Sequence, residues 1–225
     1  MFRKDYILRL IEEFGLVLKR IVELKQNRNL DEALQEVKMA IEKYMGLDAG
    51  LIAMSSDSAL LSLLTMGGQK LETSKCVLLA ELLKEQGELF GMCGEAYQSY
   101  WSYSRSLALF AEALAQDAIL RTEENQSDLE FLVNKLHTYE IGPSIKERLF
   151  KYYEATGRFD RAEDVLYELL DREPSRIGEA RLFYERLSSM DDGVLEQGGL
   201  PRAEIADGMV ALTERKKAPK SSKGS

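Results

Sequence analysis

Apolar residues recur at spacings of three and four along most of this 225-residue sequence. Residues at these spacings lie on one side of an α-helix, where they can pack against a neighbouring element. Leucine is the commonest residue, and Ala, Glu, Lys and Gln, which also favour helices, fill the positions between. No segment alternates apolar and polar residues convincingly, and no Asn-Gly pair indicates a hairpin between strands. The sequence therefore predicts an all-α protein with about ten helices.

These helices are predicted to form antiparallel pairs, because the connections between them are short. The first helix ends at a polar break, Asn27 to Asn29, and the second runs from Leu30 until Gly46. Gly67-Gly68 and Gly142-Pro143 indicate later boundaries. The remaining helices are predicted over residues 56–64, 76–99, 103–116, 127–137, 144–155, 159–171, 176–189 and 201–212.

One of these pairs, over residues 144–174, has a distinctive set of residues at fixed spacings. They are Leu149, Tyr153, Gly157, Phe159, Ala162, Leu166 and Pro174. These residue types and spacings resemble a tetratricopeptide repeat (TPR), in which a small residue on the second helix lets the first helix approach closely. Phe150 and Leu169 depart from the family pattern, which prefers smaller residues at both positions.

Two weaker units resemble the same repeat, near residues 17–46 and 88–118. In these units Arg20 and Trp101 replace the usual Leu and the usual turn Gly. The resemblance implies an irregular TPR-like α-solenoid that forms one domain over residues 1–214. A generic helical bundle, or another α-solenoid with similar packing rules, is the alternative.

The order of segments also resembles an uncharacterised family of bacterial helical proteins. It runs from Asp5-Tyr-Ile-Leu-Arg-Leu-Ile through Leu-Asp-Glu-Ala-Leu to Gly-Leu-Pro-Arg. This resemblance implies a bacterial cytoplasmic protein without a known activity. A cytoplasmic location is also predicted because the first residues lack a signal peptide and no uncharged apolar run is long enough to span a membrane. Cys76 and Cys93 both lie in apolar helical stretches, which is typical of reduced, buried cysteines.

Charge is distributed unevenly along the chain. The sequence has 30 basic and 38 acidic residues, a net charge of -8, and five of the basic residues lie in the last eleven positions. The acidic body makes nucleic acid an unexpected partner for the helical part. Residues 215–225 are predicted to form a disordered basic tail, which either keeps the chain soluble or makes weak contacts with RNA, an acidic protein or anionic lipid.

Motifs for catalysis, metal binding or cofactor binding are not found in the sequence. There is no phosphate-binding loop, no dinucleotide-binding Gly-x-Gly-x-x-Gly and only one histidine. His137 is predicted to cap a helix end. Asp191 and Asp192 are predicted to cap a helix, with a metal site as the alternative. We therefore expect no cofactor, no metal and no catalytic residue.

The most distinctive local feature is a run of aromatic residues, in which Tyr100 and Trp101 are predicted to lie at a hairpin turn. These rings either fill space between hairpins or anchor a partner. We therefore predict a non-catalytic module that binds a protein or peptide, with a homodimer as a related form. The alternative is an all-α enzyme or small-ligand sensor with an internal pocket. The candidate partner-binding residues are Lys19, Val22, Lys25, Met92, Glu95, Ser99, Tyr100, Trp101, Glu147, Arg148 and Lys151.

Overall fold

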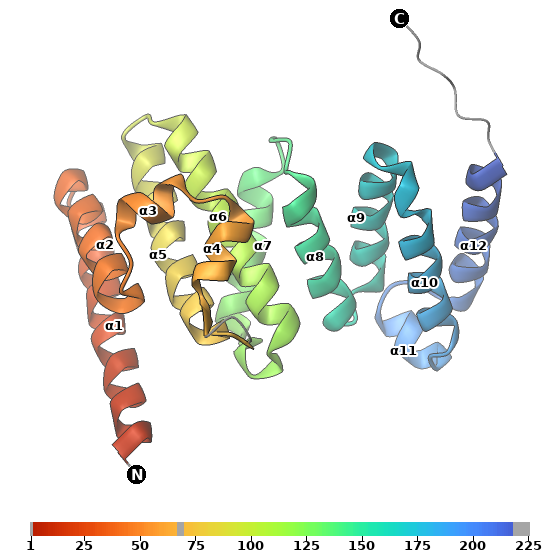
Figure 1. Ribbon diagram of the computed structural model, residues 1–225, viewed down its shortest axis with the longest axis horizontal. Helices are drawn as coiled ribbons and strands as arrows, with labels where there is room; N and C mark the ends of the chain where they lie inside the picture. The colour runs from red at the N-terminus through yellow and green to blue at the C-terminus, as the bar shows by residue number, and fades with distance from the viewer. Residues whose placement is uncertain (1, 67–69, 218–225) are drawn as a thin grey trace, which may run out of the picture. The chain divides into compact units, whose positions relative to one another are not determined.

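The computed structural model describes residues 2–66 and 70–217, and over these residues the protein is all-α (Figure 1). They form twelve α-helices, two short 3₁₀ helices and one antiparallel ladder of two residues on each side. In that ladder Thr65 pairs with Leu71 and Met66 with Lys70. The chain divides into two compact units, up to Ile141 and from Gly142 onward, whereas the sequence predicted one domain over 1–214.

Unit 1 is centred on two long helices, α5 and α6, which pack along each other. α1 and α2 pack on α5, while α4 and α7 pack on α6. The largest fully buried side chains of this unit include Phe110, Ile21 and Ile41. Its elements are α1 (Phe2–Gln26), α2 (Leu30–Met45), α3 (Ala49–Met54), α4 (Asp57–Leu63), β1 (Thr65–Met66), β2 (Lys70–Leu71), α5 (Thr73–Met92), α6 (Ala96–Gln116), η1 (Ala118–Leu120) and α7 (Glu123–Leu136).

The turn between α5 and α6 lies earlier in the chain than the sequence pattern predicted. A helix over 76–99 was expected, but α5 ends at Met92 because Gly94 takes a left-handed conformation, with φ of 80°. The amide of Glu95 then donates to the carbonyl of Phe90 at 2.9 Å, which closes the helix end. Tyr100 and Trp101 are therefore inside α6, and the prediction that they lie at the turn is wrong.

Unit 2 contains the hairpin that carries the clearest repeat pattern. Its elements are α8 (Pro143–Ala155), α9 (Phe159–Arg172), η2 (Pro174–Arg176), α10 (Ile177–Ser188), α11 (Asp192–Gln197) and α12 (Arg202–Lys217). The predicted boundaries of α8 and α9 are confirmed to within one residue, and Gly157 between them has a positive φ of 73°. Leu149, Ala162 and Leu166 are buried, as the pattern requires.

Three other predictions need correction or fall outside the described residues. α7 begins at Glu123 rather than Ser127, because the hydroxyl of Thr122 accepts from the amide of Asn125 at 3.2 Å and caps the helix. α12 continues to Lys217, so the first three residues of the predicted tail are helical. The rest of that tail, 218–225, lies outside the described residues.

The two cysteines differ in their surroundings, and both are free thiols. Cys76 is fully buried in α5, and burial raises the pKa of its thiol to about 12. Cys93 is exposed at the turn between α5 and α6, so the prediction that it is buried is wrong. Among the described helices, none has both the length and the apolar content needed to cross a membrane.

Candidate functional site

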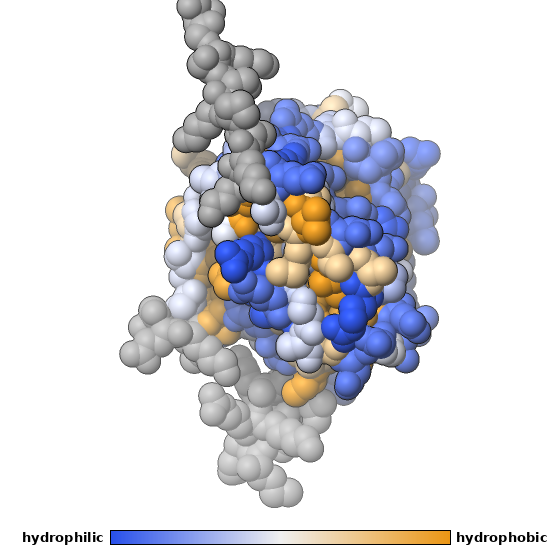
Figure 2. All heavy atoms as spheres, turned by 90° about the vertical axis from the view of Figure 1, so that its right-hand side faces the viewer, coloured by the Kyte–Doolittle hydropathy of each residue, from blue (hydrophilic) through white to orange (hydrophobic). Residues whose placement is uncertain are grey.

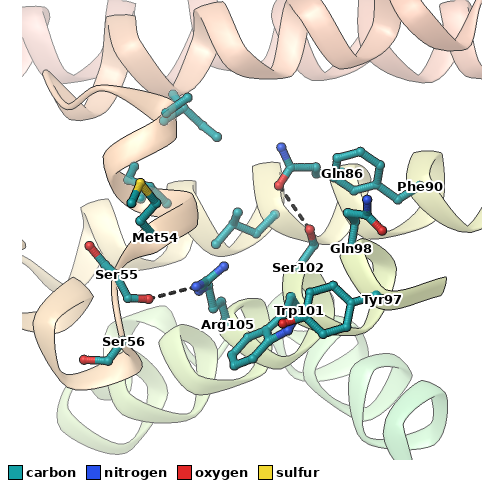
Figure 3. Close-up of a pocket in the computed structure, with 14 residues that line it drawn as sticks. Met54, Ser55, Ser56, Gln86, Phe90, Tyr97, Gln98, Trp101, Ser102 and Arg105 are labelled. Atoms are coloured by element: carbon teal, nitrogen blue, oxygen red, sulfur yellow. Dashed lines mark hydrogen bonds between the residues drawn. The ribbon is translucent and has the colours of Figure 1, made fainter. Parts of the chain in front are cut away.

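One cavity of unit 1, of about 480 Å³, is called the groove here (Figure 3). Helices α5 and α6 line one side, and the short helix α3 with the loop that follows it lines another. Its lining is largely apolar with hydroxyl, amide and one guanidinium group. The lining residues are Ile41, Ala49, Ile52, Met54, Ser55, Ser56, Leu83, Gln86, Phe90, Tyr97, Gln98, Trp101, Ser102 and Arg105.

Trp101, the only tryptophan of the chain, is held in the groove by contacts on two sides. The ring of Tyr97 lies edge-on at 5.9 Å between centroids, and the guanidinium of Arg105 lies 5.0 Å from the indole centroid. Arg105 Nη2 also donates to the carbonyl of Ser55 at 2.8 Å (Figure 3). Burial lowers the pKa of Arg105, while the charge of Asp57 opposes that shift. Arg105 therefore links α6 to the end of α3 and fixes the indole plane.

Two large apolar side chains at the edge of the groove are unusually open to water. Met54, at the end of α3, is 88% exposed, and Tyr97, in the first turn of α6, is 70% exposed. In the same lining, Ser102 donates to Gln86 Oε1 at 3.1 Å (Figure 3), and Gln98 supplies a second side-chain amide. The groove thus combines an apolar floor with hydrogen-bonding groups near its mouth.

A second cavity of unit 1, of about 500 Å³, has a more polar lining and is called the polar pocket here. Its residues are Glu88, Gly91, Met92, Ser99, Tyr100, Tyr103, Lys135 and Tyr139. The rings of Tyr100 and Tyr139 are 5.0 Å apart, and the Tyr100 hydroxyl donates to the carbonyl of Glu140 at 3.3 Å. Burial, with the charges of Glu88 and Glu85, raises the pKa of Tyr103 to about 12. Tyr103 is therefore a neutral hydrogen-bonding group at ordinary pH.

The predicted partner-binding residues are divided among different places. Trp101 lines the groove, whereas Met92, Ser99 and Tyr100 line the polar pocket. Glu95 is exposed at the start of α6. Ser99 is itself buried, and its hydroxyl donates to the carbonyl of Gly87 at 2.7 Å.

The predicted partner-binding residues on α1 mostly contact other residues of unit 1. Lys25 lies 2.5 Å from carboxylate oxygens of both Glu85 and Glu88 and thereby attaches α1 to α5. Burial acts to lower the pKa of Lys25, but the two carboxylates outweigh it and the pKa is raised. Val22 is half-buried, and Lys19 is exposed with Glu23 at 3.8 Å.

The candidates on α8 belong to unit 2. Glu147 pairs with Arg176, and Arg148 donates to the carbonyl and the hydroxyl of Ser144 at 2.5 and 2.9 Å. Lys151 is exposed. None of these three residues is in the lining of the groove.

Unit 2 has a smaller cavity of about 440 Å³, lined by residues of α10 and α12. Figure 2 shows an apolar area with hydrophilic residues around it on the side of the molecule where α12 lies. Leu182 and Val210 are large apolar residues of these two helices that are more than half exposed. The cavity is lined by Ile177, Gly178, Arg181, Met209, Leu212 and Thr213.

The two polar motifs singled out in the sequence have local roles. His137 follows α7, and its Nδ1 lies 2.5 Å from the carbonyl oxygen of Asn134, at a helix end as predicted. Asp191 occupies the position before α11 but makes no capping bond through its side chain, and Asp192 instead accepts from Arg202 at 2.5 Å. Within the described residues no cluster of three or more potential metal-ligating side chains occurs.

The fold and the site define an all-α protein with two helical units and an apolar groove in the first. The chain belongs to a family of unknown function (DUF6483), whose sequence model matches residues 1–217. This agrees with the resemblance to an uncharacterised family. Neither a curated protein nor a solved structure matches the chain.

Proposed function

We propose that this protein binds a segment of a partner protein in the groove and has no catalytic role there. The observation that carries the proposal is the exposure of Met54 and Tyr97, which line the groove together with the half-buried Trp101. Single exposed apolar residues are common, but two large ones beside an apolar cavity are typical of a surface that a partner covers. Tryptophan, tyrosine and arginine are also the residues that contribute most to binding at protein interfaces.

The chemistry of the lining favours an apolar, largely uncharged peptide segment as the occupant. Arg105 is the one charged residue of the lining, and its guanidinium already contacts Ser55 and the Trp101 ring. The floor, which includes Ile52, Leu83 and Phe90, suits an aliphatic or aromatic side chain. The amides of Gln86 and Gln98 can hydrogen-bond the peptide groups that flank it.

Further features of the sequence support an interaction role of the same kind. The helix pairs α5–α6 and α8–α9 resemble tetratricopeptide hairpins, and we propose that the units are TPR-like. The family resemblance also favours a bacterial cytoplasmic protein. The acidic composition disfavours nucleic acid as the partner of the helical body. A second copy of the chain is the other occupant to consider.

The proposal predicts that the groove selects apolar peptides. A library of displayed random dodecapeptides would be panned against the full chain, and the enriched peptides measured by calorimetry. The double variant Met54→Ser, Tyr97→Ser removes the two exposed side chains and is expected to weaken binding at least tenfold, which is about 1.4 kcal/mol. Met39→Ser is the matched control, because Met39 is also exposed but lies on α2 and outside the groove lining.

Enriched peptides that bind the double variant and wild type equally would contradict the proposal, as would a library from which none is enriched. Sedimentation of the wild-type chain at increasing concentration tests whether the chain forms a homodimer. If the wild-type chain forms a dimer and the double variant Met54→Ser, Tyr97→Ser does not, the occupant of the groove is a second copy of the chain and not a peptide.

A further inference from the structure

Three charged side chains of unit 1 lie together between α5 and α7, and none of them lines the groove or the polar pocket. Lys84 Nζ is 2.8 Å from a carboxylate oxygen of Glu81 and 2.7 Å from one of Asp128. Glu81 and Lys84 are on α5, whereas Asp128 is on α7. Their side chains are only 13%, 12% and 20% exposed. The three groups therefore join two helices in a setting that water reaches poorly.

The charges of this cluster do not balance when every group is ionised. Two carboxylates share one ammonium, which leaves a net charge of -1 in a largely buried place. Burial, together with a hydrogen bond to Asp128, raises the pKa of Glu81 to about 7, and Lys84 opposes that shift. A hydrogen bond between two carboxyl groups requires one proton on the pair. At pH 7 about half of the molecules therefore carry this proton.

The other helices packed on α5 supply charges that are engaged elsewhere. α1 brings Lys25, which Glu85 and Glu88 hold. α6 brings Glu112, an acid whose charge acts on Cys76. α2 packs through apolar residues and the Tyr44 ring; its buried residues are Ala33, Val37, Ala40, Ile41, Tyr44 and Met45. Proton binding is thus the available means of neutralising the second carboxylate.

The position of α7 affects the polar pocket. Lys135, in the last turn of α7, and Tyr139, just after it, line that pocket opposite Met92 and Tyr100. We propose that Glu81, Lys84 and Asp128 form a pH-sensitive attachment that fixes α7 to α5 and thereby controls how Lys135 and Tyr139 close the polar pocket. With one proton on the carboxyl pair the attachment is firm. Without it, two carboxylates repel each other and α7 is held less tightly.

The direction of the pH effect follows from the pKa of Glu81. Its value of about 7 in the folded chain is above the ordinary 4.5. The folded state therefore binds more protons than the opened state between these two values, so stability falls as pH rises through this window. The contribution is full below pH 4.5, is lost as pH rises through about 7, and changes no further well above that.

Hydrogen exchange of the α7 amides, corrected for the intrinsic pH dependence of exchange, measures this attachment. Wild-type protection factors are expected to fall between pH 5 and pH 7, by at most about tenfold per pH unit because one proton is involved, and to level off above pH 7. Glu81→Gln retains a hydrogen-bonding side chain without the charge. It is expected to make α7 protection independent of pH and higher than wild type at pH 8.

Asp128→Asn provides a second test if Glu81→Gln does not fold. It leaves Glu81 with Lys84 as its charged partner, so the pKa of Glu81 is expected to be lower and the pH-dependent fall to be smaller and to lie at lower pH than in wild type. Glu95→Gln is the control, because Glu95 is exposed at the start of α6 and should leave the profile unchanged. The proposal is overturned if wild-type α7 protection is flat from pH 5 to pH 8, or if the Glu81 or Asp128 variant keeps the wild-type profile.

Discussion

Replacing Phe110 by alanine is expected to lower the free energy of unfolding of unit 1 by about 3–5 kcal/mol. Phe110 is in the middle of α6 and is fully buried, so its ring contributes both apolar burial and close packing. Alanine would leave a cavity, because helices that pack on both sides of α6 cannot collapse fully into the space. Urea denaturation followed by the fluorescence of Trp101, which is on the same helix, gives the change directly.

Tyr97→Ala is the matched control for Phe110→Ala, since it also removes an aromatic ring from α6. Tyr97 is mostly exposed and its ring touches Trp101, so its loss is expected to cost no more than about 1 kcal/mol. Equal losses for the two variants would show that α6 is not the centre of the core of unit 1.

In unit 2, Gly198→Ala is expected to destabilise the fold by about 1–3 kcal/mol. A Cβ at this position would lie 2.3 Å from the Phe159 ring and 2.6 Å from the carbonyl oxygen of Gly157. Phe159 is buried and the carbonyl is part of the backbone, so neither can move aside cheaply. The close approach also allows the amide of Asp160 to donate to the carbonyl of Gly198 at 3.1 Å.

The effect of Gly198→Ala would be measured as a loss of hydrogen-exchange protection in α8 and α9. Gly193→Ala is the control, because a Cβ on Gly193 meets no atom within 4 Å. That substitution is expected to leave stability unchanged or to raise it by up to about 1 kcal/mol, as alanine favours a helix more than glycine does. Equal effects of the two substitutions on protection would contradict the close approach of Gly198 to Gly157 and Phe159.

Periodicity predicted the helices well where apolar spacing and end signals agree. α8 and α9 are the clearest case, since Pro143 begins the first and Gly157 separates the pair. The α5–α6 turn was misplaced because Gly94 lies between two apolar stretches with similar spacing. Apolar spacing alone does not show that this glycine takes a positive φ, so the pattern favoured one continuous helix.

The site was predicted only in part, because contacts distant in sequence determine it. Trp101 was identified as a distinctive aromatic residue, and it does line a cavity. Met54 and Arg105 were missed, although a charged residue within the apolar run of α6 could have drawn attention to Arg105. Its partner Ser55 is 50 residues away. Likewise, Lys25 was predicted to bind a partner, but its carboxylate partners within the chain lie 60 and 63 residues further along the sequence.

The contrast between the two thiols makes the unmodified chain suitable for site-specific labelling. A thiol reacts as the thiolate, so Cys76, buried and with a pKa raised to about 12, is protected in the folded state while Cys93 is open to reagents. A fluorophore attached at Cys93 would lie next to Met92 of the polar pocket, and it could accept excitation energy from the single indole of Trp101. The native sequence thus supplies a donor and an attachment point near both cavities of unit 1.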